Sequence, residues 1–403
     1  MIKLLFNFAK DRNSGEFRRV YRISRDFDKI LETDTYEILI IPIRALLYFD
    51  QLAQFKFGCK TLIYPILLPF SRIRFISKIN SWLIRILARY LIWRYKPSVV
   101  FGETIISSPV FIKGKHINIC DLHGDYIDEL NCQGLKKSTL IPIESNENHI
   151  IEIVDQLVVQ SQAMKQHLLK KYPHLNHNNI IVYNCGVDCN LFDYRNINKK
   201  AIRSELQFSE KDIIFVYAGG SQPWQKLYET LKIYHLVKLN ISNAKLMLLL
   251  QDGEKEIQDF CNNHNIKDVS IFSKIPFRKV HKYLSIANYG FLIREDVQMN
   301  RVASPTKLGE YLACGLIVIT TSVASHWEWL PASKCIIIDL NKSDMGAEEI
   351  TRHISSSIDR VDIRDEMRKI ALNNLSDEQD YLNLSTHIIR IKNKISDSKS
   401  ANL

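Results

Sequence analysis

Residues 288–322 of this 403-residue chain read NYGFLIREDVQMNRVASPTKLGEYLACGLIVITTS, in which two apolar runs enclose a polar segment. The runs Gly290–Ile293 and Leu316–Thr321 have the length and composition of buried strands. Between them, Ser304 suits the N-cap of a helix and Pro305 suits its first position. Strand, loop, helix and strand in this order predict a βαβ unit whose helix begins at the carboxyl ends of the strands.

The first turn of this predicted helix has the features of an anion-binding site. The positive end of the helix dipole at Ser304, Pro305 and Thr306 favours a phosphate group, and so do the free N–H groups that the first turn offers at residues other than Pro305. Lys307 adds a full positive charge, and Glu310 lies one turn later on the same face. We interpret the pair as a grip on a nucleoside diphosphate, with Lys307 on phosphate and Glu310 on ribose hydroxyls. The alternative is an ordinary solvated ion pair on a helix surface.

The segment Ser304–Gly315 resembles the nucleotide-sugar-binding segment of retaining glycosyltransferases with the GT-B fold, family 4 in particular. That family carries two glutamates here: Glu310 matches the second, and Val302 stands at the position of the first. The resemblance extends to an Asp-x-His-Gly motif at Asp121–Gly124 and to an Asn-x-Gly-Val-Asp turn at Asn184–Asp188. It implies an α/β protein of GT-B architecture, with two Rossmann-like domains and a cleft between them.

Two further loops carry glycines at the ends of predicted strands. Gly219 and Gly220 follow a buried run, and two glycines there let backbone N–H groups approach a phosphate. Lys226 lies near the place of the family's pyrophosphate-binding lysine, although the family's arginine is absent from this loop. Gly15 matches a family glycine that approaches the donor phosphates, but an ordinary turn between a strand and a helix explains it equally well.

The resemblance implies a retaining hexosyltransferase that moves a sugar from a nucleoside diphosphate sugar to a hydroxyl of a glycan or lipid-linked acceptor. The implied pathway is surface polysaccharide biosynthesis, such as that of O-antigen or capsule. Catalytic roles fall on His123, which would contact the transferred sugar, and on Lys307 and Glu310. The residues implied to bind the donor are Gly15, Gly219, Gly220, Lys226, Ser304, Pro305, Thr306, Lys307 and Glu310. Because cations and amide groups can stabilise a leaving diphosphate, we expect no metal and no other cofactor.

Two other functions are open at this stage. A nucleotide-sugar epimerase of the same fold would need its own acid and base carboxylates in the cleft. A catalytically silent, membrane-associated scaffold would retain the fold alone, and Val302 in place of the first family glutamate favours it.

The length of the chain predicts two domains. We expect an acceptor-side Rossmann-like domain at residues 1–195, a nucleotide-sugar-binding domain at 196–375, and a final helix at 376–403 that crosses back. Strands are predicted at Ile2–Phe8, Tyr36–Ile41, Ser98–Phe101, Ile117–Cys120, Gln156–Val159, Ile180–Tyr183, Asp212–Ala218, Lys245–Leu250, Val269–Phe272, Tyr289–Ile293, Leu316–Thr321 and Lys334–Ile338. Their alternation with helical patterns is typical of doubly wound parallel sheets.

Charge and composition indicate where the protein acts. The net charge is +10, so an anionic partner is expected. Residues 44–96 are rich in aromatic and aliphatic side chains and carry ten cations against one acid, Asp50. This composition favours an anionic membrane surface, and the alternative is a pair of core helices with a solvated basic rim. Nucleic acid is not expected, because no binding motif accompanies the charge.

Eight scattered cysteines fit a reducing cytoplasm. The apolar run after Met1 is short and soon gives way to polar residues, which predicts a first strand rather than a signal peptide. No apolar run reaches the ~18 residues that a transmembrane helix needs. We therefore expect a cytoplasmic protein that lies peripherally on the inner face of the membrane.

Overall fold

The computed structural model describes residues 1–8, 15–42, 60–66, 74–323, 330–357 and 361–400. The chain divides into two compact units. Unit 1 comprises Met1–Tyr183 together with the chain from Tyr381 onward, and unit 2 comprises Asn184–Asp380.

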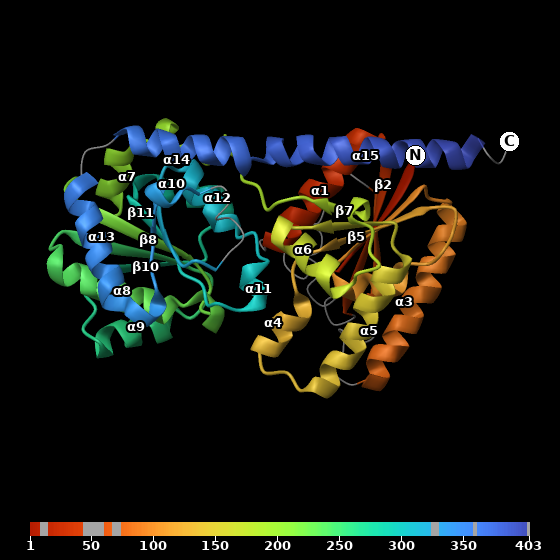
Figure 1. The fold of residues 1–403 in the computed structure, drawn as a ribbon, viewed down its shortest axis with the longest axis horizontal. Helices are drawn as coiled ribbons and strands as arrows, with labels where there is room; N and C mark the ends of the chain where they lie inside the picture. Colours follow the sequence, from red (N-terminus) through yellow and green to blue (C-terminus); the bar gives the residue numbers. More distant parts are fainter. Residues whose placement is uncertain (9–14, 43–59, 67–73, 324–329, 358–360, 401–403) are drawn as a thin grey trace. The chain divides into compact units, whose positions relative to one another are not determined.

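Unit 1 is built on a parallel sheet that, within the described residues, has seven strands in the order β3-β2-β1-β4-β5-β6-β7. The strands are β1 (Ile2–Asn7), β2 (Asp34–Pro42), β3 (Lys60–Ile66), β4 (Val99–Glu103), β5 (Ile117–Leu122), β6 (Gln156–Val159) and β7 (Ile180–Val182). Its helices are α1 (Gly15–Leu31), α3 (Arg74–Tyr95), α4 (Tyr126–Cys132), α5 (Lys137–Ile153), α6 (Gln162–Lys171) and most of α15 (Asp377–Ser400) (Figure 1).

Unit 2 repeats the plan with a parallel sheet that has, in the described part of the chain, six strands in the order β10-β9-β8-β11-β12-β13. The strands are β8 (Ile213–Gly219), β9 (Ala244–Leu250), β10 (Val269–Ser273), β11 (Tyr289–Leu292), β12 (Ile317–Thr320) and β13 (Cys335–Ile337). Its helices are α7 (Lys199–Glu205), α8 (Leu227–Asn240), α9 (Glu254–Asn263), α10 (Phe277–Ile286), α11 (Gln298–Arg301), α12 (Thr306–Ala313), α13 (Ser343–Ser357) and α14 (Val361–Asn374) (Figure 1).

Alternation along β8 explains why unit 2 has helices on both faces of its sheet. Ile214 and Val216 belong to the buried cluster formed with α10, α12 and α14. Phe215 and Tyr217 belong to the opposite cluster, formed with α8, α9 and α13. Since successive side chains of a strand point to opposite faces, a continuous apolar run is buried on both sides.

The strand order places a switch point in each sheet, where the chain order reverses. The switch lies between β1 and β4 in unit 1 and between β8 and β11 in unit 2. Ligands of open parallel sheets bind outside the carboxyl ends of the strands at such points. The loops after β8 and β11 are therefore where a site is expected in unit 2.

The predicted strands are all present, with ends that differ by a few residues. One strand, β3, was not predicted, because it contains Pro65 and lies in a segment interpreted from its basic, aromatic composition. A proline is tolerated there, since β3 is the outermost strand of the described sheet and its free edge needs no N–H donor.

The division between the units falls at Tyr183–Asn184, earlier than the boundary predicted between residues 195 and 196. The intervening turn belongs to unit 2 because its backbone is bonded there. The Asp380 carboxylate accepts from the N–H groups of Asn184 and Gly186, both at 3.1 Å. The N–H of Val187 donates to Leu375 O at 2.8 Å.

The final helix begins one residue later than predicted and belongs to unit 1 from Tyr381 onward. Leu384 and Ile388 lie in the buried cluster of unit 1 with Val20 and Phe27 of α1. From Tyr381 onward the helix therefore has an apolar face that is buried within unit 1.

Arg368 of α14 fastens the turn after Asn184 to unit 2. Its guanidinium donates to the carbonyls of Cys189 (2.7 Å), Phe192 (2.9 Å) and Ala313 (2.9 Å). The same side chain pairs with Asp193 at 3.0 Å and is only 5% exposed. Arg195 also pairs with Asp193, at 2.7 Å, but its side chain is 57% exposed.

We expect Arg368→Met to lower the free energy of unfolding by about 3 kcal/mol, because it leaves buried carbonyls without donors. Arg195→Met, the matched control on the same carboxylate, should change stability little. Chemical denaturation of both variants measures the difference. Equal midpoints for the two variants would show that buried Arg368 contributes no more to stability than exposed Arg195.

Candidate functional site

The loop after β8 contains the predicted glycines and is held in a defined shape. The Tyr217 hydroxyl donates to Gly220 O at 2.6 Å, and the Gly220 N–H donates to Gln225 Oε1 at 3.3 Å. Lys226 follows in the left-handed region, with φ of 51°. Its ammonium is 3.3 Å from Glu295 and 3.7 Å from Glu229, so acids already offset its charge.

The loop after β11 lies against the loop after β8. Trp224 O accepts from the N–H of Glu295 at 3.0 Å and from Asn300 Nδ2 at 3.2 Å. Thr321, just after β12, exchanges hydrogen bonds with the backbone of Arg294 at 2.9 and 3.1 Å. Hydrogen bonds thus join the loops after β8, β11 and β12 at the switch point of unit 2.

Arg294, in the loop after β11, adds a positive charge to these joined loops, and the sequence did not predict its role. Its side chain is partly buried, and burial lowers the pKa of the guanidinium while Tyr217 and Tyr311 oppose that shift. In the part of the chain that the structure describes, no carboxylate forms an ion pair with Arg294. A desolvated cation without an anion favours a ligand that supplies one.

Helix α12 starts differently from the prediction. Pro305 is its N-cap and Thr306 its first residue, without a side-chain cap. Ser304 is not the cap, because its hydroxyl accepts the N–H of Cys185 at 3.2 Å. The helix ends at Ala313, and Gly315, just after the C-cap residue Cys314, has a φ of +74° that suits glycine.

The predicted pair on α12 is formed. Lys307 Nζ lies 2.8 Å from Glu310 Oε2, and the Glu310 side chain is only 4% exposed. The alternative of a solvated surface pair is therefore wrong, because one partner is buried. Thr306 and Lys307 at the free end of the helix are partly exposed, and the rest of α12 is buried.

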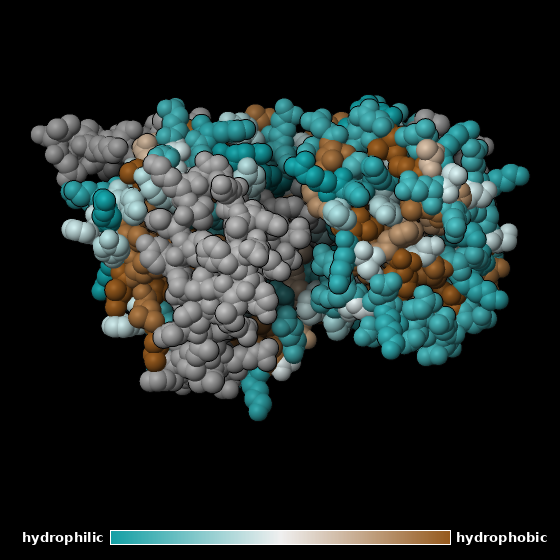
Figure 2. All heavy atoms as spheres, turned by 180° about the vertical axis from the view of Figure 1, so that it is seen from behind, coloured by the Kyte–Doolittle hydropathy of each residue, from teal (hydrophilic) through white to brown (hydrophobic). Residues whose placement is uncertain are grey.

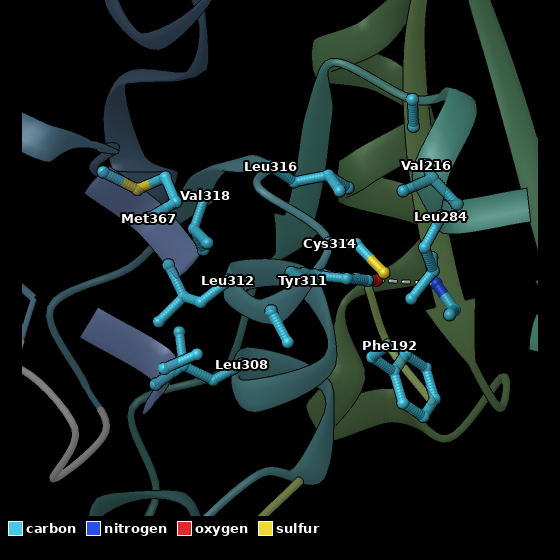
Figure 3. Packing of buried hydrophobic residues seen from close by; sticks show 14 of the residues in the cluster. Phe192, Val216, Leu284, Leu308, Tyr311, Leu312, Cys314, Leu316, Val318 and Met367 are labelled. Carbon is cyan, nitrogen blue, oxygen red and sulfur yellow. Dashed lines mark hydrogen bonds between the residues drawn. The ribbon is translucent and has the colours of Figure 1, made fainter. Parts of the chain in front are cut away.

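Tyr311 attaches α12 to the central strands. Its hydroxyl accepts the N–H of Ala218 at 2.9 Å and donates to Phe291 O at 3.4 Å. In Figure 3 the Tyr311 ring points toward Val216 on one side of the helix, and other α12 side chains face Met367. Gly290 makes room for the ring, since a Cβ there would lie 2.5 Å from it.

The position of the first family glutamate does not face solvent. Val302 is 2% exposed and follows the short helix α11, which forms within the segment predicted as a polar loop. Of the two family glutamate positions, only that of Glu310 carries a carboxylate, and it pairs with Lys307.

Unit 1 has its own cluster after β5. Asp121 is fully buried and pairs with Arg19 of α1 at 2.8 Å and with His123 Nε2 at 3.0 Å. These two cations hold the pKa of Asp121 well below its usual range, against burial. Burial lowers the pKa of His123, but Asp121 raises it more, and the net shift is upward. The buried Nδ1 of His123 has no hydrogen-bond partner among the described residues, so it can serve a ligand.

The site residues predicted from the sequence therefore fall into separate groups. Gly219, Gly220 and Lys226 lie at the end of β8 and in the loop after it, and Lys307 and Glu310 lie on α12 of the same unit. His123 lies in unit 1. Gly15 is the first residue of α1, and the loop before it lies outside the described residues. Arg294 and Arg19 were missed, since an arginine's partners cannot be read from its neighbours in sequence. Among the described residues no cluster of His, Cys, Asp and Glu is arranged to hold a metal ion.

We expect Asp121→Asn to lower the pKa of His123, because burial then acts without the opposing carboxylate. The raised His123 pKa stabilises the fold below its ordinary value of 6.5, and this contribution is lost as pH rises. The lowered Asp121 pKa stabilises above its ordinary value of 3.8 and is lost as pH falls. The variant should therefore lose more stability near about pH 5.5 than near about pH 9.

An NMR titration of the His123 ring measures this shift directly. Asp125→Asn is the control, since Asp125 pairs with a different histidine, His167, at 3.1 Å. An unchanged His123 midpoint in Asp121→Asn would contradict the coupling.

Comparisons of sequence and of structure gave different results. Neither a family model nor a curated protein matches the sequence. A glycosyltransferase from Rickettsia africae is similar in structure, with a TM-score of 0.69, 17% identity, and coverage of 97% of this chain and 99% of that chain. Anabaena Alr3699/HepE, crystallised with UDP and glucose, is similar with a TM-score of 0.70, 12% identity, and coverage of 97% and 100%.

WaaG, a glycosyltransferase involved in lipopolysaccharide biosynthesis, gives a TM-score of 0.68 at 11% identity over 96% of this chain and 99% of that chain. The matches span both units at low identity, so they establish the architecture. Together with the two parallel sheets, they show that the chain has the GT-B fold expected from its sequence.

Proposed function

We propose that the protein is a glycosyltransferase that uses a nucleoside diphosphate sugar. The observation that carries the proposal is Arg294, a partly buried cation without a carboxylate partner in the described chain. It stands at the switch point of unit 2, in the loop after β11, which is bonded to the glycine loop through Trp224 and leads along the chain to the free end of α12. A diphosphate matches this set of donors, since it carries the negative charge that all three lack.

The roles of the residues follow from their positions. Arg294, the N–H groups of Gly219 and Gly220, and the amino end of α12 bind the diphosphate. They also stabilise the charge that develops on it as the sugar leaves. Lys226 and Lys307 shift from Glu295 and Glu310 toward phosphate oxygens, and Glu310 accepts from the ribose hydroxyls.

His123 contacts the transferred sugar in this proposal. Its support is the buried Nδ1, which has no hydrogen-bond partner in the described structure, and the Asp121 carboxylate, which fixes the orientation of the ring. Transfer proceeds with retention, as in the family 4 enzymes that the sequence resembles, and needs no metal.

The acceptor is a hydroxyl of a glycan or lipid-linked acceptor in surface polysaccharide biosynthesis. WaaG, one of the structural relatives, is involved in lipopolysaccharide biosynthesis, and this supports the choice. We place the protein in the cytoplasm, peripherally on the inner face of the membrane. UDP-glucose is the first donor to test, because HepE was crystallised with it.

We expect UDP at ~100 times its dissociation constant to stabilise the protein by about 2.7 kcal/mol in thermal unfolding. Arg294→Gln should weaken UDP binding about 30-fold, since one charged contact contributes about 2 kcal/mol. Arg301→Gln is the matched control, because Arg301 is 55% exposed and pairs with Asp296 in the same loop. Glu310→Gln should bind UDP more weakly and keep the fold.

Product analysis with labelled UDP-sugars separates the proposal from its rivals. Transfer to an acceptor, with UDP released and the anomeric configuration retained, supports it. An epimerised donor would identify an epimerase, and no turnover with intact UDP binding would favour a silent scaffold. Equal UDP affinity in Arg294→Gln and Arg301→Gln would remove the observation on which the proposal rests.

A further inference from the structure

Helix α3 in unit 1 has one face in the protein core and an apolar face in solvent. Ile84, Ala88 and Leu91 are at most 1% exposed and pack inward. The opposite face carries large apolar side chains with high exposure: Ile79 (39%), Trp82 (62%), Ile86 (44%), Tyr90 (52%) and Trp93 (72%). These residues follow each other at intervals of three or four, which places them in one stripe along the helix.

The stripe is long and lies at the outer edge of its unit. Figure 1 shows α3 as the orange helix at the edge of unit 1, and Figure 2 shows brown side chains along that edge. Single exposed apolar residues are normal on a protein surface, whereas a contiguous apolar stripe indicates an interaction surface.

Charge beside the stripe identifies its partner. Lys78, Arg85 and Arg89 are exposed and share the flank next to Trp82, and Arg94 is exposed on the other flank. Lys96 is exposed directly after the helix. The sequence Arg74–Tyr95 contains no Asp or Glu. A second copy of this helix would bring like charges together, whereas an anionic lipid surface offers both an apolar interior and opposite charge.

Resting on the proposed function, we infer that α3 lies flat on the anionic surface of a membrane. Its stripe enters the interface between headgroups and acyl chains, and the flanking cations contact lipid phosphates. Tryptophan and tyrosine are the residues that such interfaces favour. No described helix is long and apolar enough to cross a membrane, and α3 is amphipathic rather than apolar all round. The enzyme would thereby meet its acceptor in the plane of the membrane.

Co-sedimentation of the full chain with vesicles tests the inference. Vesicles of phosphatidylcholine mixed with phosphatidylglycerol should bind the protein, and binding should weaken as salt rises. Pure phosphatidylcholine should bind it at least about tenfold less. The charge variant Lys78→Gln, Arg85→Gln, Arg89→Gln, Lys96→Gln should lose at least about tenfold in partitioning.

A matched variant controls for net charge. Lys200→Gln, Lys211→Gln, Lys274→Gln, Lys279→Gln removes as many exposed cations from unit 2 and should bind like wild type. Equal loss in both charge variants would mean that total charge binds the vesicle, and would overturn the role of α3.

The apolar stripe has its own test. Trp82→Ser with Trp93→Ser should abolish binding, whereas Trp82→Phe with Trp93→Phe should retain it and lose the fluorescence quenching that brominated lipids cause. A wild-type dimer in sedimentation velocity that the serine variant converts to monomer would overturn the lipid assignment in favour of a second copy.

Vesicle binding and UDP binding are measured independently, so the inference and the proposed function can fail separately. Thermal stabilisation by UDP without vesicle binding would refute only the inference. Vesicle binding without UDP stabilisation would refute only the proposed donor.

Discussion

The hydroxyl of Tyr311 joins α12 to two central strands of unit 2. It accepts from the N–H of Ala218 in β8 and donates to the carbonyl of Phe291 in β11. Burial raises the pKa of this phenol, so the hydroxyl keeps its proton and can donate at any ordinary pH. Because parallel strands end at one edge of a sheet, fixing α12 to both strands also fixes the glycine loop, Arg294 and Lys307 relative to one another.

The charges at this edge differ in what a ligand must do to engage them. Lys226 and Lys307 already pair with Glu295 and Glu310, so a phosphate has to share or displace those carboxylates. Arg294 has no such competitor among the described residues, and the cost of its partial burial is offset only when an anion arrives. The cations of the free protein therefore favour a negatively charged diphosphate over a neutral sugar.

Sequence reasoning predicted the parts of the molecule that local pattern controls. Apolar runs predicted the strands, and the spacing of Lys307 and Glu310 predicted their contact. The prediction that Ser304 is the N-cap of α12 was wrong because of a residue distant in sequence. The Ser304 hydroxyl accepts the N–H of Cys185, and Pro305 is the N-cap instead. Arg294 was missed for a related reason, since the absence of a partner is a property of the folded chain.

In residues 44–96, sequence composition predicted the surface chemistry but not all of the secondary structure. The composition of this segment predicted an amphipathic, basic surface but missed β3, because an edge strand with a proline resembles a loop in sequence. Much of the segment lies outside the described residues. In the described part, the exposure of Trp82 and Trp93 shows that the predicted apolar surface lies on one face of one helix, α3.

The central claim is that the carboxyl edge of the unit 2 sheet binds a nucleoside diphosphate. Hydrogen–deuterium exchange with and without UDP measures this most directly, because it reports amide protection along the whole chain. The account predicts protection concentrated in peptides that cover 217–226, 292–296 and 304–312, and its loss in Arg294→Gln. Protection confined to other segments, or none at saturating UDP, would contradict it.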